Sequence, residues 1–357
     1  MIRIAVSAAI VIFVVFMLVW RTRIAANGRF FDNYFSVDQT RSIKGMCAVF
    51  ILLSHVCMYL ADTFPSLFLF KYVGAIMVAG FFFASGYGLQ YGVMNKENYL
   101  KGFFSKKMLS LAVPYYIINF FYIVTNHMDI KTILASLFGY YLWFMMAIAI
   151  FYTGFFLCNK LFGKKWSCVA MTVFVLCYIV VMNRLHFGFW WYNSCLAFAA
   201  GIWICQMKDS FTAFFKKHWG IKTLILTAVF AASYIYYCRH NHNETLLTLV
   251  ISLINTTTFA VMLSVLSMKI QIKNPILYFC GGLSLELYLT HALWITWLRN
   301  GFWHNLAPSL LDKDAVYFFA ILAGTVIMSV AVHIVSGFML KAVRGISYKG
   351  LEKNAKI

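Results

Sequence analysis

The sequence predicts an all-α, polytopic integral membrane protein, a helical bundle of about eleven transmembrane helices. Its composition is 62% hydrophobic and only 11% charged, whereas soluble globular domains average about 25% charged residues. Apolar runs of the roughly 20 residues needed to cross a bilayer recur along the whole chain. Lys and Arg residues are concentrated in alternate connections between these runs, as expected when successive connections lie on opposite sides of a membrane.

Eleven apolar runs carry this prediction, and they divide the chain into three parts. We expect residues 1–40 to form an N-terminal transmembrane anchor with a cytoplasmic connection, 41–340 the main membrane domain, and 341–357 a basic cytoplasmic tail. The first run is interpreted as an uncleaved anchor because three arginines closely follow it and only one precedes it. The runs lie near 3–20, 43–60, 72–94, 109–125, 133–157, 167–183, 188–207, 222–238, 247–267, 276–298 and 316–340.

The distribution of basic residues predicts the orientation in the cell membrane. Of the 30 Lys and Arg residues, 23 lie in one alternating set of connections and 7 in the other. Since cytoplasmic connections carry the excess, the N-terminus is expected outside and the C-terminus in the cytoplasm. The net charge of +19 is therefore attributed to topology beside a lipid bilayer and predicts no nucleic-acid partner. The basic connections are 21–44, 96–107, 160–165, 208–222, 269–273 and 341–356.

The stretch from Arg41 to His55, RSIKGMCAVFILLSH, is the strongest candidate for a functional site. Eleven residues of helix from Lys44 to His55 make three turns plus about 20°, so both side chains share one face, roughly 16 Å apart. Arg41 falls near the same stripe. Ionisable groups at membrane depth usually mark substrate or proton pathways. The alternative is a histidine that bonds a neighbouring helix, with the two cations as interfacial anchors.

Two further stretches near the cytoplasmic side have a structural and a functional interpretation. The third run contains GFFFASGYGL, whose small residues predict close helix packing, with ligand contact by Ser85 as the alternative. Lys106 and Lys107 precede Pro114, which begins or kinks the fourth helix. Such a lysine pair is either a topological anchor or a holder of the phosphates of a cytoplasmic ligand.

The tenth run, CGGLSLELYLTHALWI, is a second polar interruption within the membrane. On a helix, Tyr288 and His291 share one stripe, whereas Glu286 points to nearly the opposite side. If the helix is continuous from Ile276, His291 reaches about 22 Å into the bilayer. That depth is close to the depth expected for His55, and two histidines at one level suggest a shared role.

No metal site is expected from the histidines and cysteines. The nine cysteines show no CxxC and no repeated spacing, so they are interpreted as small buried hydrophobic residues. His240 and His242 are two residues apart in a polar connection, but they have no acidic or thiol companions that would complete a metal-ligand set.

Four stretches together resemble the membrane acyltransferase-3 family: KGMCAVFILLSH, GFFFASGYGL, KKMLSLAVPYY and LSLELYLTH. The resemblance extends from about Arg41 to Leu340 and leaves the first helix as an addition to the family's ten-helix core. Two departures are visible. Lys44 stands where the family usually has an arginine, and Ser110 and Leu111 stand where a basic residue often precedes the proline.

The resemblance implies an O-acyltransferase that moves an acyl group, most simply acetyl, from cytoplasmic acyl-CoA to a hydroxyl group. The acceptor would be a glycan, a cell-envelope polymer or another molecule. His55 would act as general base or as acyl carrier. The residues implied to orient the imidazole or bind the acceptor are His291, Tyr288 and Glu286, and those implied to bind acyl-CoA (acetyl-CoA) are Lys44, Arg41, Lys106, Lys107 and Ser85.

A different class of function stays open from the residues alone. A transporter or flippase would use the intramembrane histidines and Glu286 as a proton relay, without covalent chemistry. Paired broken helices in repeated halves, typical of many transporters, are not evident in the sequence. Whether the chain forms a homodimer is also left open.

Overall fold

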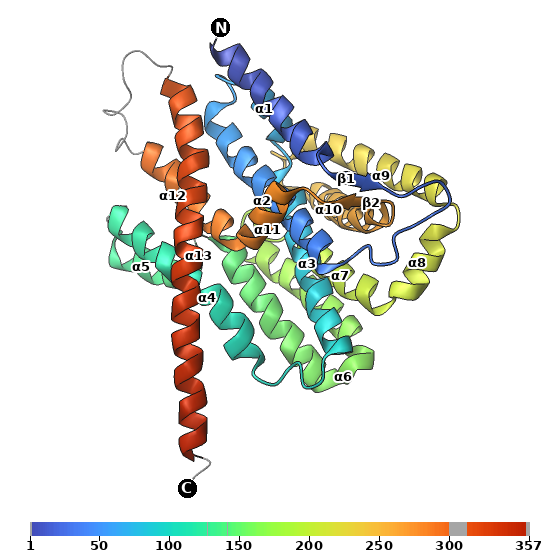
Figure 1. Cartoon of the computed structure of the whole chain (residues 1–357), viewed down its shortest axis with the longest axis vertical. Helices are drawn as coiled ribbons and strands as arrows, with labels where there is room; N and C mark the ends of the chain where they lie inside the picture. The colour runs from blue at the N-terminus through green and yellow to red at the C-terminus, as the bar shows by residue number, and fades with distance from the viewer. Residues whose placement is uncertain (1, 127, 141, 300–312, 355–357) are drawn as a thin grey trace. The chain divides into compact units, whose positions relative to one another are not determined.

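The computed structural model describes residues 2–126, 128–140, 142–299 and 313–354, and within them the chain is almost entirely helical (Figure 1). Two short strands, β1 (Thr22–Ile24) and β2 (Ile270–Ile272), and two 3-10 turns complete the structure. The helices are α1 (Ile2–Val19), α2 (Val37–Leu60), α3 (Gly74–Asn95), α4 (Phe103–Thr125), α5 (Ile130–Leu137), α6 (Trp143–Arg184), α7 (Leu196–Gln206), α8 (Lys208–Lys216), α9 (Trp219–His240), α10 (Leu246–Ser267), α11 (Pro275–Gly282), α12 (Ser284–Arg299) and α13 (Lys313–Asn354).

Among the described residues, seven helices are long and apolar enough to cross a membrane, or eight if α11 and α12 form one broken span. This confirms a multi-pass helical protein but not the predicted number of eleven. The apolar part of α1, Arg3–Val19, is shorter than the other spans. The seventh predicted run, 188–207, contains a 3-10 turn at Phe189–Trp191 and the 11-residue helix α7, and so no helix long enough to span a membrane.

The 42-residue helix α6 is a helical hairpin rather than one straight rod. Gly163 interrupts it with φ 65° and ψ 177°, a conformation that residues with side chains rarely adopt. A Cβ atom added to Gly154 would strike the ring of Phe174, although twenty residues of straight helix would separate them by about 30 Å. The two halves therefore face each other, which accounts for two of the predicted runs and for the connection predicted at 160–165.

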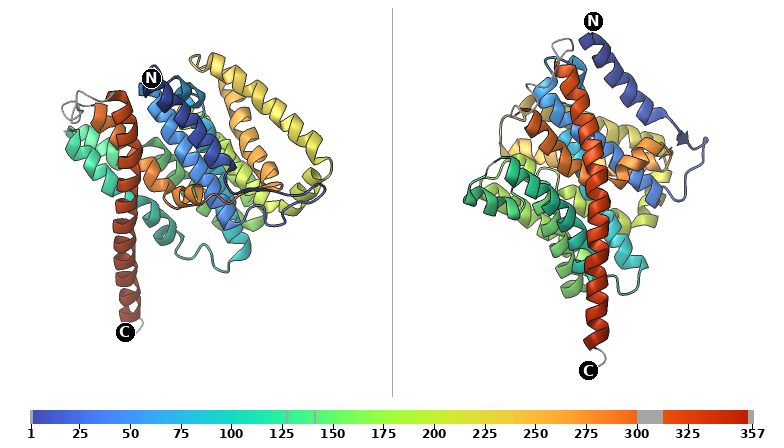
Figure 2. Two further views of the ribbon diagram at one scale, coloured as in Figure 1. Left: turned by 45° about the horizontal axis from the view of Figure 1, so that its top comes forward. Right: turned by 60° about the vertical axis from the view of Figure 1, so that its left-hand side comes forward.

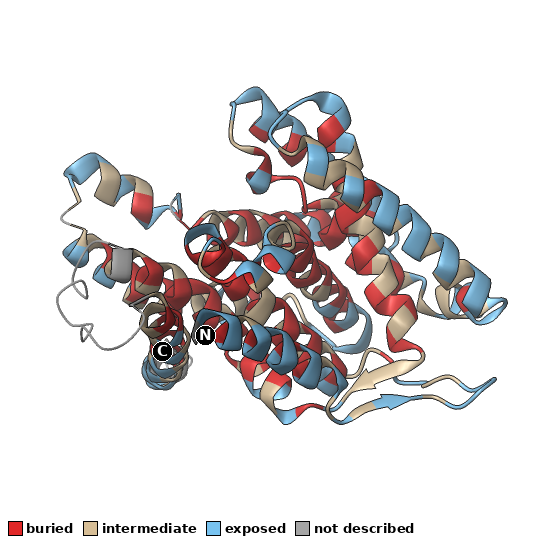
Figure 3. Cartoon of the chain, turned by 90° about the horizontal axis from the view of Figure 1, so that it is seen from above, coloured by how far each residue is buried: buried red, intermediate tan, exposed pale blue. Residues whose placement is uncertain are grey.

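The chain forms two compact units, each made of two separate segments. Unit 1 comprises Met1–Lys101 and Thr153–Gly282, and unit 2 comprises Gly102–Tyr152 and Leu283–Ile357. In unit 1 the core is formed by α2, α3, α7, α10 and α11, which pack against one another in pairs. Most helices carry buried residues on one side and exposed residues on the other (Figure 3).

Glycines allow the core helices of unit 1 to cross with their backbones in contact. A Cβ atom on Gly45 of α2 would collide with the carbonyl oxygen of Leu277 on α11. Similarly, a Cβ atom on Gly86 of α3 would collide with the carbonyl oxygen of Phe198 on α7. The glycine-rich third run therefore serves helix packing, which was the structural interpretation of that stretch.

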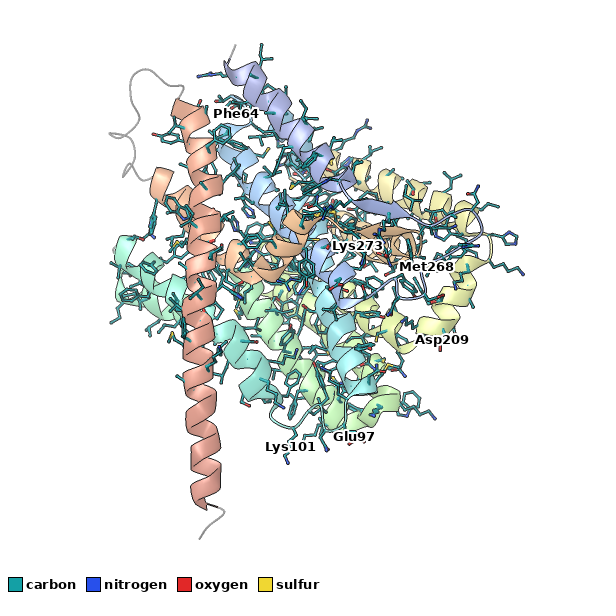
Figure 4. All side chains as sticks on the ribbon, viewed as in Figure 1. Phe64, Glu97, Lys101, Asp209, Met268 and Lys273 are labelled. Carbon is teal, nitrogen blue, oxygen red and sulfur yellow. The ribbon has the colours of Figure 1, made fainter. Side chains whose placement is uncertain are left out.

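Three connections of unit 1 that the charge pattern assigns to one side of the membrane do lie together. Strand β1 pairs with β2 in antiparallel register, with Thr22 opposite Ile272. The hydroxyl groups of Tyr34 and Thr212 are hydrogen-bonded at 2.7 Å. A small hydrophobic cluster joins these segments, and its buried members are Tyr34, Phe215, Val265 and Met268. The connections 21–44, 208–222 and 269–273 thus lie together, and Figure 4 labels Met268 and Lys273 on either side of β2.

One backbone carbonyl of the irregular segment before α7 accepts a hydrogen bond from a neighbouring helix. Asn193 is buried in this segment, and the hydroxyl of Thr256 donates to its carbonyl oxygen at 2.9 Å. Non-helical backbone is tolerated at membrane depth only where the protein supplies such partners. Helices α9 and α10 lie side by side as an antiparallel pair (Figure 2) and are tied by Asn255, whose amide donates to Ser233 Oγ at 3.0 Å.

Unit 2 contains α4, α5, α12 and α13, together with the first residues of α6. Helix α4 begins at Phe103, before the apolar run near 109–125, so Pro114 lies inside the helix and does not begin it. Helix α5 is fastened to α4 by the Tyr115 hydroxyl, which donates to the Ser136 carbonyl oxygen. Helix α13 continues through most of the predicted tail, whereas the connection 300–312 and residues 355–357 lie outside the described residues.

Candidate active site

The candidate residues of unit 1 lie on one uninterrupted helix. Ser36 caps α2 by accepting a hydrogen bond from the Gln39 amide at 3.2 Å, and the helix then continues to Leu60. Arg41 and Lys44 therefore belong to the helix itself rather than to a preceding loop. Because α2 is continuous, Lys44 and His55 share one face at the separation expected from helical geometry, about 16 Å along the axis.

Arg41 is held against α11 by three interactions with one residue. Its Nε donates to the carbonyl oxygen of Tyr278 at 3.1 Å, and a terminal nitrogen donates to the Tyr278 hydroxyl at 3.2 Å. The guanidinium carbon lies 4.2 Å from the centroid of the Tyr278 ring. At the same crossing, a Cβ atom on Gly281 would collide with the carbonyl oxygen of Arg41. Arg41 thus contributes to packing of α2 on α11, whatever else it binds.

His55 has a defined tautomer. Its Nδ1 lies 2.9 Å from the carbonyl oxygen of Ile51, one turn earlier on α2. A carbonyl oxygen only accepts hydrogen bonds, so Nδ1 carries a proton. In a neutral imidazole the lone pair then resides on Nε2, the nitrogen that can take a proton from a substrate.

The remaining predicted donor-binding residues are divided between the two units. Lys44 on α2 and Ser85 on α3 are half-buried in unit 1, and Ser85 immediately precedes the close contact at Gly86. Lys106 and Lys107 lie in the first two turns of α4 in unit 2. The N-terminus of a helix carries partial positive charge, so this lysine pair adds to a field that favours an anion.

In unit 2, the ring of Tyr288 lies between His291 and the start of α6. Their ring centroids are 5.7 Å apart, and the Tyr288 ring lies 5.2 Å from the ring of Phe144 in an edge-on arrangement. His291 is buried, and its Nδ1 donates to the Leu287 carbonyl oxygen at 3.0 Å. His291 therefore has the same protonated nitrogen as His55.

Glu286 lies on a different face of α12, as the helical spacing predicted. Its carboxylate is 2.7 Å from Nδ1 of His333 on α13. One turn further along α12, the Thr290 hydroxyl is hydrogen-bonded to Ser329 Oγ at 2.7 Å and to the carbonyl oxygen of Thr325 at 3.3 Å. A polar seam thus runs between α12 and α13 through two otherwise apolar helices.

The model of the acyltransferase-3 family, described as an acyltransferase domain, matches residues 41–334. The chain belongs to the acyltransferase-3 family. No curated protein and no solved structure matches the chain. The match begins at Arg41 and ends one residue beyond His333. The stretch from Arg41 to His55 and the Glu286–His333 pair therefore lie inside it, and α1 lies outside it.

The depth in the membrane that the sequence predicted for His291 of this acyltransferase-3 protein does not hold. The predicted depth of His291 assumed a continuous helix from Ile276, but α11 ends at Gly282 and α12 begins at Ser284. Two successive glycines, Gly281 and Gly282, weaken the helix at this point. The same glycines allow the close crossing with α2, so the break and the crossing have a common cause.

His333 is the site residue that sequence reasoning missed. It is a lone histidine in the apolar run 316–340. His55 was selected because an ionisable group at membrane depth usually marks a functional site, and the same reasoning applies to His333. Its pairing with Glu286 could not be inferred, because the two residues are 47 positions apart. Among the described residues, no three His, Cys, Asp or Glu side chains gather as a metal site.

Proposed function

We propose that this membrane acyltransferase moves an acyl group, most simply acetyl, from cytoplasmic acyl-CoA to a hydroxyl group, with His55 as the reacting base. The observation that carries the proposal is the Nδ1 hydrogen bond of His55 to Ile51. It directs the basic Nε2 away from its own helix backbone. The acceptor class we infer is a glycan, a cell-envelope polymer or another hydroxyl compound.

In this mechanism Nε2 of His55 removes the proton of the acceptor hydroxyl as its oxygen attacks the thioester carbonyl. The tetrahedral intermediate then expels the thiolate of CoA, and the imidazolium returns its proton to that sulfur. The products are the O-acyl acceptor and CoA. The Ile51 carbonyl oxygen accepts a hydrogen bond from Nδ1. This bond strengthens when the ring is charged, so it stabilises the transient imidazolium.

The donor would be held at the start of α2, where Arg41 and Lys44 offer positive charge to its phosphates. Lys106, Lys107 and Ser85 are further candidates for donor contact. In unit 2, His291, Tyr288 and Glu286 are candidates for orienting groups or for acceptor binding. A covalent route is an alternative, in which Nε2 of His55 attacks the thioester and carries the acyl group to the acceptor.

The test is transfer of radiolabelled acetyl from acetyl-CoA by purified protein. His55→Ala should lower kcat by a factor on the order of 10² or more, the usual contribution of a general base. His240→Ala is a matched control, because His240 makes the same bond to the carbonyl one turn earlier, Tyr236, at 3.0 Å. Equal transfer by wild type and His55→Ala would refute the assignment.

Two further measurements separate the mechanisms. Exchange of labelled CoA into acetyl-CoA without any acceptor requires a covalent acyl-enzyme, whereas direct transfer does not support it. Movement of substrate across vesicles that contain no acyl-CoA would instead indicate the transporter alternative. The base mechanism would be supported if wild-type protein shows neither CoA exchange nor substrate transport, but transfers acetyl when an acceptor is added.

A further inference from the structure

A basic pocket lies at the two-stranded sheet of unit 1, outside the residues used in the proposed reaction. It has a volume of about 470 Å³ and is lined by Arg21, Thr22, Arg23 and Lys273. The register that pairs Thr22 with Ile272 places Arg21 opposite Lys273, and Arg23 follows on the same strand. Three cations from segments 250 residues apart in the chain thus surround one space.

Within the described residues, no ion pair balances the charges of this pocket. Arg21, Arg23 and Lys273 form no ion pair there, and the guanidinium of Arg21 lies 5.4 Å from the centroid of the neighbouring Trp20 ring. Like charges placed opposite each other on paired strands destabilise the pairing. The hydroxyl of Thr22 already donates to the Leu18 carbonyl oxygen at 2.7 Å. An anion in the pocket would be held by the three cations and would relieve their repulsion.

The pocket begins where the apolar helix α1 ends. Helix α1 has 18 residues, about 27 Å of helix, which is close to the hydrocarbon thickness of a bilayer. Trp20 stacks on Phe16 with ring centroids 5.0 Å apart, and tryptophan is enriched at membrane boundaries. Arg21 follows directly. If α1 crosses the hydrocarbon layer, the three cations would stand at the level of the lipid headgroups.

The same helix also offers a surface for a hydrocarbon chain. The Asn274 side chain donates to the Met17 carbonyl oxygen at 2.7 Å and fixes the end of α1 beside Lys273. The other face of α1 is apolar and exposed along its whole length. Its large exposed residues are Ile4, Val11, Ile12, Phe13, Val15, Phe16 and Val19.

We propose that the basic pocket binds the phosphate headgroup of an anionic membrane lipid, whose hydrocarbon chain lies along α1. Arg21 and Arg23 can each bind phosphate oxygens through two nitrogens, and Lys273 adds a point charge. Both arginines lie before residue 41, where the family match begins. The site thus joins two arginines from outside the matched domain to Lys273 within it. The phosphates of acyl-CoA are the other source of the same chemistry, and the experiment separates the two.

The test compares lipid retention by the full-length protein in detergent, measured by native mass spectrometry. Phosphatidylglycerol is the anionic probe and phosphatidylcholine the zwitterionic one. Wild type should retain phosphatidylglycerol preferentially, and Arg21→Gln/Arg23→Gln/Lys273→Gln should lose the preference. Each cation removed should weaken binding roughly fivefold, the effect expected of one Lys or Arg at an anionic headgroup.

The matched control is Lys160→Gln/Lys164→Gln/Lys165→Gln, which removes the same charge from exposed lysines at the turn of α6. It should retain the lipid as wild type does. Arg23→Lys, which keeps the charge, guards against misfolding of the triple variant and should retain most of the binding. Equal retention by wild type and the Arg21/Arg23/Lys273 triple would overturn the site.

Acetyl-CoA supplies the second arm. If acetyl-CoA displaces phosphatidylglycerol from wild type and the triple variant loses acetyl-CoA affinity, the pocket binds the donor and the lipid assignment is wrong. If acetyl-CoA affinity is the same in both proteins while lipid retention differs, the lipid assignment stands. Either result is independent of the role of His55, which is tested by acetyl transfer.

Discussion

At the scale of single residues, the structure shows that Arg41 has a role in helix packing, which its spacing from Lys44 and His55 did not predict. Arg41 uses its guanidinium to hold Tyr278 of α11. Its loss should therefore lower thermal stability as well as any donor affinity. Lys44 is half-buried on the neighbouring stripe of α2. Replacing Lys44 tests whether a positive charge at this position contributes to donor binding.

Lys44→Ala should raise the KM for acetyl-CoA severalfold, because one point charge near the phosphates is lost. Lys44→Arg should match or improve on wild type, since arginine can bind phosphate through two nitrogens. Steady-state kinetics on purified protein give both values. Lys160→Ala serves as control, and an unchanged KM in Lys44→Ala would remove Lys44 from the donor site.

The Glu286 and His333 pair makes a second prediction at this scale. His333→Ala leaves the buried Glu286 carboxylate without its partner at 2.7 Å, which should cost about 1–3 kcal/mol of stability. Adding Glu286→Gln should recover much of that loss, because a neutral amide is cheaper to bury than an unpaired charge. Thermal unfolding of the two single variants and the double variant measures the coupling. Strictly additive effects would show that the pair is not coupled.

At the scale of helices, unit 1 depends on glycines at which backbones touch. Gly45→Ala places a methyl group against the Leu277 carbonyl oxygen and should force α2 and α11 apart. Overpacking of this kind costs about 1–3 kcal/mol. Gly88→Ala is the control, because a Cβ atom there meets nothing within 4 Å and alanine favours the helix.

The two glycine variants are compared by their unfolding temperatures in detergent. Gly45→Ala should unfold at a lower temperature than wild type, and Gly88→Ala at the same temperature or higher. If both variants behave alike, the crossing of α2 and α11 does not depend on glycine at position 45.

At the scale of the whole molecule, the charge bias predicts that Lys101 and Lys216 are cytoplasmic and His242 is external. Each is replaced by cysteine and labelled in intact cells with a membrane-impermeant maleimide, with wild type as background. Only the residue-242 variant should react. The structure adds a condition, since Arg29 and Lys216 belong to connections that pack together. Cysteines at these two positions must label from the same side, and labelling of either one alone would contradict the fold.

Much of the outline follows from the sequence because it depends on local composition. The apolar runs, the membrane class and the helical face shared by Lys44 and His55 needed only periodicity and length, whereas the family was recognised by the resemblance of four short stretches. The placement of Glu286 on the opposite face from Tyr288 and His291 was also local, since it follows from about 100° per residue.

The tertiary structure decided whatever depends on residues far apart in the chain. It determined that α6 folds back at Gly163, that the tenth run breaks at Leu283 and that His333 faces Glu286. It also closed Arg21, Arg23 and Lys273 around one pocket through the pairing of β1 with β2. Backbone contact at a glycine, a bond across 47 residues and a strand pairing across some 250 arise only when the chain is folded, because no local pattern encodes the partner.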